Sequence, residues 1–399
     1  FFLLLISSID AFKILVFKSK FAHSHSKFMG VLADTLQDAG HEVVSLMPVM
    51  DPSVPDYTTT KIIRIERVPE TQRHLDSFHE LNFFTLTYNA WHLPWTKGRT
   101  MAGIYEAMCD KVLDEPGLIE MMKDEKFDVM LNEGDACGIG DCNLFYFKKI
   151  VSIKVRKLKS TLSRDIGIPL PLSYVQSLNT LRLDPHSMWS RAMNWINHKV
   201  SEKLHDVILD ASEKVFKKRY GPSFPDFSEI MAKSALIITN QEPVLSAAHP
   251  SLKKIIDLGG IVASESKPLD ERWLSLLSLR SRTVLVSFGS VARSKTMPEA
   301  AKKAILTALP TFPNITFIWK YETPEDDFAT EEVGRIDNIV LTQWVPQNDL
   351  LGDDRVVAFV SHGGADQPYN AAMMAKNGMA VVYDKFDLND ARKLTDALR

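Results

Sequence analysis

The sequence predicts an α/β protein made of two successive strand–helix halves, and three observations carry this prediction. A strand at 13–17, an amphipathic helix at 28–39 and a strand at 41–46 form a βαβ unit. A second strand and helix, between 283 and 309, begin a fresh sheet. Between the two halves, residues 249–274 carry two prolines and a Gly-Gly pair, which is typical of a passage between domains.

The composition is that of an ordinary globular protein. With 399 residues the chain can build two domains with full cores, and 45% hydrophobic and 24% charged residues are usual values. The formal net charge of -3 gives no reason to expect a nucleic-acid partner. Cys109, Cys137 and Cys142 form no metal-ligand spacing, and their odd number argues against a disulfide framework. We therefore expect neither a metal site nor a disulfide framework.

The first residues, 1–11, are apolar and then small. We interpret them as the remnant of a secretory signal, the alternative being a buried first strand that begins early. The acceptor sequon Asn314-Ile315-Thr316 fits a luminal protein. No run of 18 apolar residues occurs, so no transmembrane helix is expected in the chain as given. The expected domains are then residues 12–262 and 263–399.

Polar side chains follow two predicted strands of the first half. His23 and His25 lie in the loop after the first strand, and Glu133 and Asp135 follow the strand at 127–131. In an open parallel sheet such loops lie at the carboxyl ends of the strands, where ligands bind. The histidines are candidates for base chemistry, although either could instead cap the helix or lie in solvent.

The rest of the first half is predicted from local patterns. Residues 143–160 are strongly basic, which indicates either a surface patch for anionic partners or, as we favour, a solvated excursion. The prolines of 166–175 predict an ordered loop that lines a cleft. A Gly-x-Gly at 138–140 lacks the third glycine of a dinucleotide fingerprint, which argues against a dinucleotide oxidoreductase. Further helices are expected at 101–112, 116–123, 185–209 and 211–219, and a strand at 235–239.

The second half ends in a stretch, 344–370, that combines the elements of a nucleotide site. Further strands are expected at 315–320 and 338–341, and the apolar run 356–360 predicts a buried strand. That run leads directly into a His-Gly-Gly turn at 362–364 and a polar cluster. A strand, a glycine turn and polar side chains are what a nucleotide site on an open sheet requires.

With these residues in view, the chain resembles the UDP-glucuronosyltransferase and UDP-glucosyltransferase family of the secretory, animal type. The motifs that carry the resemblance are WVPQNDLL, HGG, DQPYNA and LVSFGS, with FAHSHSKFMGVLADTLQDAGHEV, IGIPLPLSYV and VVYDKFDL in support. The resemblance implies a GT-B fold, in which two Rossmann-like domains face each other across a cleft. The amino-terminal domain would hold a small lipophilic acceptor and the carboxy-terminal domain a UDP-sugar.

The same resemblance implies an activity and a location. The reaction would move glucuronic acid or glucose from UDP-glucuronate or UDP-glucose to an acceptor hydroxyl, with inversion and without a further cofactor. The family works in the lumen of the endoplasmic reticulum and is held there by a membrane anchor, which we do not expect within the chain as given. Self-association into a homo-oligomer is left open.

The resemblance also assigns roles to residues. His25 would be the general base and His23 structural, with Glu133 or else Asp135 orienting the base. The remaining assignments concern the UDP-sugar. They are Trp344 stacking on uracil, Gln347 at the nucleoside hydroxyls, Ser290 and His362 donating to phosphate, Gly363 and Gly364 admitting the backbone, and Asp366 and Gln367 at the sugar hydroxyls.

This chain departs from the family pattern after Gly364. Family members carry a helix and a strand between HGG and the DQ pair, whereas here only Ala365 intervenes. The lost helix N-terminus would have bound phosphate and the lost strand belongs in the sheet, so we expect exposed core and weakened UDP binding. The basic stretch 143–160 likewise replaces a family helix. The alternative function is therefore an inactive relative, or a chain with mis-joined coding segments, acting at most as a binding or partner subunit.

Overall fold

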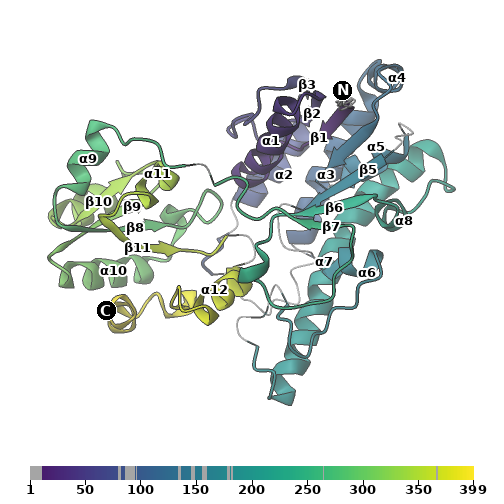
Figure 1. Cartoon of the computed structure of the whole chain (residues 1–399). Helices are drawn as coiled ribbons and strands as arrows, with labels where there is room; N and C mark the ends of the chain where they lie inside the picture. Colours follow the sequence, from purple (N-terminus) through teal and green to yellow (C-terminus); the bar gives the residue numbers. More distant parts are fainter. Residues whose placement is uncertain are drawn as a thin grey trace, which may run out of the picture.

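The computed structural model describes residues 11–79, 82–85, 95, 97–133, 136–144, 149–154, 160–177, 180, 183–263, 265–364 and 367–399. Two parallel sheets, which lie side by side, organise this part of the chain (Figure 1). The first contains β1 (Lys13–Phe17), β2 (Glu42–Pro48), β3 (Lys61–Ile65), β4 (Val129–Asn132), β5 (Lys149–Lys154), β6 (Leu236–Thr239) and β7 (Ile255–Asp257). The second contains β8 (Arg282–Ser287), β9 (Ile315–Lys320), β10 (Ile339–Thr342) and β11 (Val356–Ser361).

Helices cover both faces of the first sheet because its central strand is apolar on both sides. Leu15 and Phe17 of β1 face one core, and Ile14 and Val16 face the other. The second core is closed by α1 (His23–Asp38). Burial of a Phe side chain contributes roughly 1.5–3 kcal/mol to folding. The helices that close the first core are α3 (Lys97–Asp114), α4 (Leu118–Asp124), α5 (Ala136–Leu144), α7 (Met188–Tyr220) and α8 (Phe227–Ala232), while α2 (Pro69–His79) and α6 (Ser160–Asp165) pack outside them.

The strand order β3-β2-β1-β4-β5-β6-β7 creates a switch point at the centre of the first sheet. The chain leaves β1 toward β2 on one side and returns to pair β4 with the other side of β1. The connections after β1 and β4 therefore diverge at the carboxyl ends of these strands. In open α/β sheets this crevice is where ligands bind.

The second sheet repeats the same logic on a smaller scale, with the order β10-β9-β8-β11 and a switch point between β8 and β11. One face packs against α9 (Glu271–Leu277) and α11 (Gln347–Leu351). The opposite face packs against α10 (Glu299–Ala308) and α13 (Ala391–Leu398). Figure 1 shows α12 (Gln367–Lys376) between the two sheet units.

A segment of the first half docks on the second. Phe84 joins the core beside α10 and lies edge-on to Phe288, with ring centroids 5.4 Å apart. The Asn82 amide donates to the Thr296 carbonyl at 2.8 Å, and the Lys385 ammonium donates to the Phe83 carbonyl at 2.8 Å. These contacts hold the two sheets with their carboxyl ends toward a shared boundary.

Several element boundaries differ from the sequence prediction. Helix α1 begins at His23, not near 28, so both histidines lie in its first turn rather than in a loop. The two helices expected between 185 and 219 are one helix, α7, with Ser187 as its N-cap. The passage at 249–274 contributes β7 to the first sheet and α9 to the second.

The solvated excursion expected at 143–160 is wrong for the part of it that the structure describes. Strand β5 lies inside the first sheet, between β4 and β6, and Val151 and Ile153 are buried. Its lysines, Lys149 and Lys154, stand at the two ends of the strand. The high lysine content therefore obscured an apolar strand core, and residues 145–148 and 155–159 lie outside the described part.

Strand β11 is not the fully buried strand that its apolar run predicts. It is the last strand of its sheet in the described part of the chain, so one backbone edge has no strand partner there. Val357 is 53% exposed, and Val381, in a segment that joins no strand, is also exposed. This exposure follows from the short connection after Gly364, because no further strand covers the edge.

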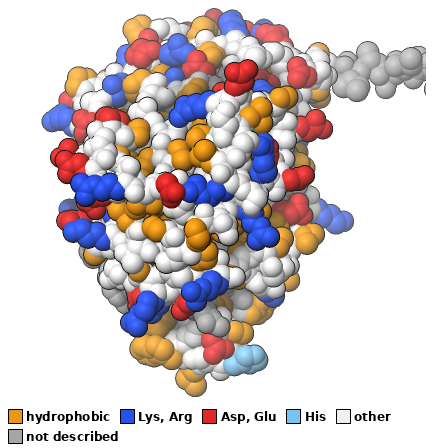
Figure 2. Space-filling view, turned by 90° about the vertical axis from the view of Figure 1, so that its left-hand side faces the viewer, with side chains coloured by type: hydrophobic (Ala, Val, Ile, Leu, Met, Phe, Trp, Pro, Cys, Tyr) orange, Lys and Arg blue, Asp and Glu red, His pale blue; other side chains and the backbone are white. Residues whose placement is uncertain are grey.

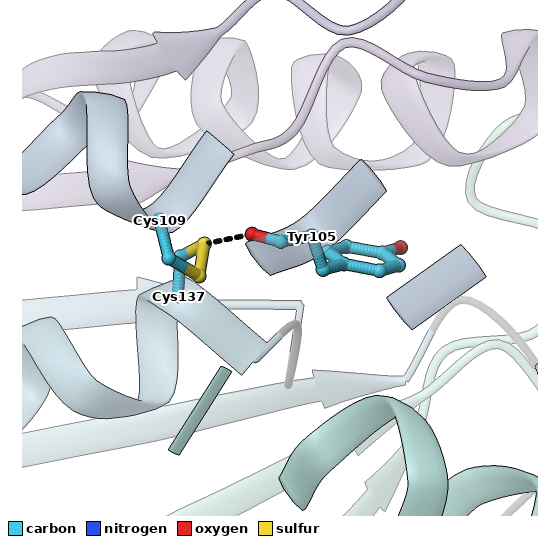
Figure 3. The surroundings of a disulfide bond; sticks show 3 residues. All are labelled: Tyr105, Cys109 and Cys137. Carbon is cyan, nitrogen blue, oxygen red and sulfur yellow. Dashed lines mark hydrogen bonds between the residues drawn. A yellow bond between two sulfur atoms is a disulfide. The ribbon is translucent and has the colours of Figure 1, made fainter. Parts of the chain in front are cut away.

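Cys109 and Cys137 form a single disulfide, which the sequence does not predict, and Cys142 is buried and reduced. Figure 3 shows the bond tying α3 to α5, with the Tyr105 carbonyl oxygen 3.6 Å from the Cys137 sulfur. Counting three cysteines could not reveal a single bridge with one thiol left over. Cys137, one end of the bridge, lies four residues beyond Glu133 in the chain.

Loss of the disulfide is expected to destabilise the chain. The bridge closes a loop with a sequence separation of 28, for which chain entropy gives about 3–4 kcal/mol. Cys109→Ala/Cys137→Ala should therefore lower the denaturant midpoint of unfolding, as should reductant with the unmodified chain. Reductant should leave the double variant unchanged. An unmodified chain whose midpoint is insensitive to reductant would contradict the expectation.

Asp141 on α5 is the most unfavourably placed charge in the described core. It is completely buried, neither carboxylate oxygen has a hydrogen-bond partner among the described residues, and burial raises its pKa to about 8. Its carboxyl is consequently protonated at neutral pH in the folded chain and ionised in the unfolded chain. The neutral form is stabilised by folding, and that stability is lost as the pH rises through the folded pKa.

Asp141→Asn is expected to raise the free energy of unfolding at pH 8 by on the order of 1–3 kcal/mol, because the amide carries no charge to desolvate. Near pH 4 the two proteins should differ little. The check is urea unfolding at a series of pH values between 4 and 8. Parallel stability curves for the two proteins would contradict the assignment.

The surface carries charges of both signs. On the face of the second sheet unit that Figure 2 shows, acidic and basic side chains are interspersed, with hydrophobic groups between them. Among the described helices, none has both the length and the apolar composition that crossing a bilayer requires.

Candidate functional site

The first feature of the site is a histidine–carboxylate pair at the switch point of the first sheet. His25 Nδ1 is hydrogen-bonded to Oε1 of Glu133, which follows β4 directly. The side chain of His25 is 22% exposed and that of Glu133 only 5%. The carboxylate is therefore covered while the imidazole is partly exposed. Asp135, the other predicted partner, lies outside the described residues.

Local geometry separates the roles of the two histidines. Successive helix residues are rotated by about 100°, so His23 and His25 point in directions about 200° apart. His25 faces Glu133, whereas Nδ1 of His23 lies 2.8 Å from the hydroxyl of Tyr57. Burial lowers the pKa of His23, although the Asp51 carboxylate opposes the shift, and the Lys320 ammonium lowers that pKa further. His23 is thus neutral at pH 7.

The second feature comprises two glycine turns at the switch point of the second sheet. Gly289 and Ser290 follow β8, and Ser290 is half-buried. The imidazole of His362 lies over Gly289, where an added Cβ would come within 2.7 Å of its Cε1. Gly289 also has φ +80°, so both the space and the backbone there require glycine.

His362 is a polar side chain without a described polar partner. Its Nδ1 is buried and makes no hydrogen bond within the described residues. Burial, with a further contribution from the Lys320 ammonium, lowers the pKa of His362 to about 4. The imidazole is therefore neutral at physiological pH and can donate one N–H to a bound anion.

The turn after His362 leaves the backbone of two glycines partly exposed. Gly363 and Gly364 have φ values of +74° and +75°, in the region that favours glycine. The amide of Asn370 donates to the Gly363 carbonyl at 2.7 Å and so ties α12 to the turn. Asp366 lies outside the described residues, and of Gln367 only the backbone is described, as the first residue of α12.

Trp344 lies between the two units. It is 55% exposed, and its indole lies 5.2 Å from the ring of His23 and 5.5 Å from the ammonium of Lys320, measured to ring centroids. Gln347, three residues on, is exposed at the start of α11. The predicted base-stacking residue is thus exposed and contacts the amino-terminal half.

Lys320 is a site residue that the sequence reasoning missed. It ends β9, is nearly buried, and donates to the Gly289 carbonyl at 2.9 Å and to Glu322 at 3.0 Å. Its ammonium lies beside Trp344, His362 and His23, and so places a positive charge where the turns converge. A lysine that directly follows three apolar strand residues, in ITFIWK, was the available signal.

Known proteins with similar sequences indicate the family of this chain. A family model described as UDP-glucoronosyl and UDP-glucosyl transferase matches residues 12–383. A putative UDP-glucuronosyltransferase of Caenorhabditis elegans, ugt-48, is 26% identical over 94% of this chain and 76% of its own length. Human 2-hydroxyacylsphingosine 1-beta-galactosyltransferase is 27% identical over 91% of this chain and 65% of its own length.

Solved structures agree on the fold. The glycotransferase of kitacinnamycin superimposes with a TM-score of 0.60 at 16% identity, over 98% of this chain and 90% of its own. The spinosyn rhamnosyltransferase SpnG, complexed with thymidine diphosphate, gives 0.55 at 15% identity, over 97% and 90%. Two parallel α/β units with these neighbours establish the GT-B fold. The chain therefore belongs to the UDP-glucoronosyl and UDP-glucosyl transferase family and is a UDP-glycosyltransferase of that family.

Proposed function

We propose that this chain transfers glucuronic acid or glucose from the corresponding UDP-sugar to a hydroxyl group of a small lipophilic acceptor, with inversion at the anomeric carbon. The observation that carries the proposal is the pairing of His25 with the covered carboxylate of Glu133 at the switch point of the first sheet. A neutral imidazole held in one tautomer by a carboxylate is a general base suited to pH 7.

The chemistry follows from that pair. With Nδ1–H donated to Glu133, Nε2 of His25 would accept the acceptor's hydroxyl proton as the oxygen attacks the anomeric carbon. The new carbon–oxygen bond forms on the face opposite the departing phosphate oxygen, and UDP leaves with the electron pair of the broken bond. The proton ends on His25, whose imidazolium Glu133 stabilises.

The turns of the second sheet are suited to the leaving group. UDP gains negative charge as it departs, and fixed donors and cations that face it lower the barrier. Ser290, His362 and the Lys320 ammonium would face the diphosphate, while Trp344 would stack on uracil and Gln347 would contact the nucleoside hydroxyls. Two solved neighbours, LpCGTa in complex with UDP and SpnG complexed with thymidine diphosphate, support a nucleotide-sugar donor. Asp366 and Gln367 remain the proposed contacts to the sugar.

We place this reaction in the lumen of the endoplasmic reticulum. The Cys109–Cys137 disulfide supports that compartment, because disulfides form and persist in oxidising environments. The apolar residues 1–11 and the Asn314 sequon, which is exposed just before β9, support it as well.

The test is release of UDP on mixing the purified chain with UDP-glucuronate or UDP-glucose and a phenolic acceptor. UDP release that requires both the donor and the acceptor, with one sugar preferred, is the expected result. UDP binding without acceptor-dependent release would overturn the proposed reaction and leave a binding protein. The choice between the two sugars is an outcome of the same experiment.

A further inference from the structure

The loop that precedes β3 is unusually constrained. Tyr57 has φ +55°, a conformation that side-chain-bearing residues rarely adopt and that costs of order 1–3 kcal/mol. Its carbonyl oxygen packs closely against Gly30 of α1. A Cβ added to Gly30 would lie only 1.8 Å from that oxygen. Backbone strain of this kind persists only where the surroundings over-determine it.

Three cations secure the loop. Asp56 accepts from the Lys20 ammonium at 2.8 Å and from the Arg64 guanidinium at 2.5 Å. Lys18, which is almost completely buried, donates to the Asp56 backbone carbonyl and to that of Ser26 on α1. The strained residue is therefore locked against the first turns of α1.

The Tyr57 side chain extends from this loop, and its hydroxyl is hydrogen-bonded to His23. The hydroxyl and Nδ1 of His23 are 2.8 Å apart, and the His23 ring lies 5.2 Å from the Trp344 indole with a 40° tilt. Asp56, Tyr57 and His23 thus form a continuous support from the first sheet to an exposed aromatic residue of the second. Neither the proposed base nor the proposed phosphate donors account for this support.

We propose that His23 is a positioning residue for the nucleotide base: it holds the indole of Trp344 in the orientation that stacks on uracil, although His23 itself belongs to the acceptor-binding half. The proposal rests on the proposed function, because it assumes that Trp344 receives uracil. Helix α1 would then have two roles. His25 on one side of the helix would be the general base, and His23 on the other side would support the donor site. Binding of UDP would consequently favour the approach of the two halves.

The test is calorimetric measurement of UDP affinity for the full chain and its variants. His23→Ala should weaken UDP binding by about 2- to 12-fold, the range expected for loss of one aromatic contact. His23→Phe, which keeps a ring against Trp344, should bind within about twofold of the unmodified chain. His186→Ala, a histidine exposed before α7, is the matched control and should have no effect.

Two further measurements separate positioning from a general structural role. In a Trp344→Ala background, His23→Ala should cause no additional loss of UDP affinity, because the contact is already gone. In turnover, His23→Ala should raise the KM for UDP-sugar and leave the KM for acceptor unchanged. A merely structural role would lower affinity in both backgrounds and shift both constants.

The outcomes distinguish this proposal from the proposed function. Trp344→Ala could weaken UDP binding while His23→Ala leaves it unchanged, or makes it tighter because the imidazole competes with uracil. Either result would overturn only the role of His23. If the unmodified chain does not bind UDP, the proposed function falls and the role of His23 falls with it.

Discussion

Replacing His25 with alanine is expected to lower kcat for glycosyl transfer by about 10²–10⁴-fold, the contribution typical of a positioned general base. UDP affinity should stay within about twofold, because His25 faces Glu133 in the amino-terminal half rather than the glycine turns. Steady-state UDP release measures the first quantity and calorimetry with UDP the second. Together they separate a chemical role from a folding defect.

The control for this experiment is His186→Ala, which removes an imidazole from the same half of the chain without touching the cleft. It should retain the activity of the unmodified chain. If His25→Ala keeps more than about a tenth of the original kcat, another group accepts the proton and the assignment of the base is wrong.

Trp344→Ala is expected to weaken UDP binding by about 5- to 150-fold, since stacking of a base on an aromatic side chain contributes about 1–3 kcal/mol. The indole is open to the cleft and has no competing role in the core, so folding should be preserved. Because the uracil contact is present before and during the reaction, the loss should appear mainly in the KM for UDP-sugar.

Trp195 on α7 provides a matched control for this variant. It is 53% exposed, against 55% for Trp344, and it too lies near a lysine ammonium, that of Lys199 at 6.0 Å. Trp195→Ala should leave UDP affinity unchanged. Equal losses for both variants would show that Trp344 has no specific role in binding the nucleotide.

The sequence predicted much of the fold because local periodicity carries it. The strand at Ile315–Lys320 coincides with its prediction, and the other strands of the second sheet differ by a residue or so at their ends. Strand β5 was not predicted for the opposite reason, because lysines at both of its ends and on either side of it interrupt its short apolar run. The start of helix α1 was predicted too late because its first turn, HSHS, is polar and lacks an acidic cap signal.

Local sequence patterns do not predict contacts between residues that are far apart in the chain. The resemblance assigned His25 and offered Glu133, and the structure places the two together at the switch point. Nothing local indicates that His23 meets Trp344, or that Lys320 turns inward at the end of β9. These contacts depend on how two separate sheets face each other, which composition and spacing do not encode.

The short connection after Gly364 affects both the family pattern in the sequence and the edge of the second sheet in the structure. From the sequence it removes a helix and a strand of the family pattern, and in the structure β11 is left at the edge of its sheet with Val357 exposed. The turn itself is retained. Gly363 and Gly364 keep the backbone conformation that favours glycine, and the imidazole of His362 is largely buried. Residues before the connection should therefore carry most of the UDP affinity.

The central claim is that this chain joins a sugar to an acceptor through His25 and Glu133, and product analysis tests it most directly. The purified chain is incubated with UDP-glucuronate or UDP-glucose and a phenol, and the product's anomeric configuration is read by proton NMR. We expect a β-linked glycoside formed from the α-linked donor, and at most about a hundredth as much with His25→Ala. An α-linked product, free sugar alone, or a β-glycoside formed equally well by His25→Ala would contradict the claim.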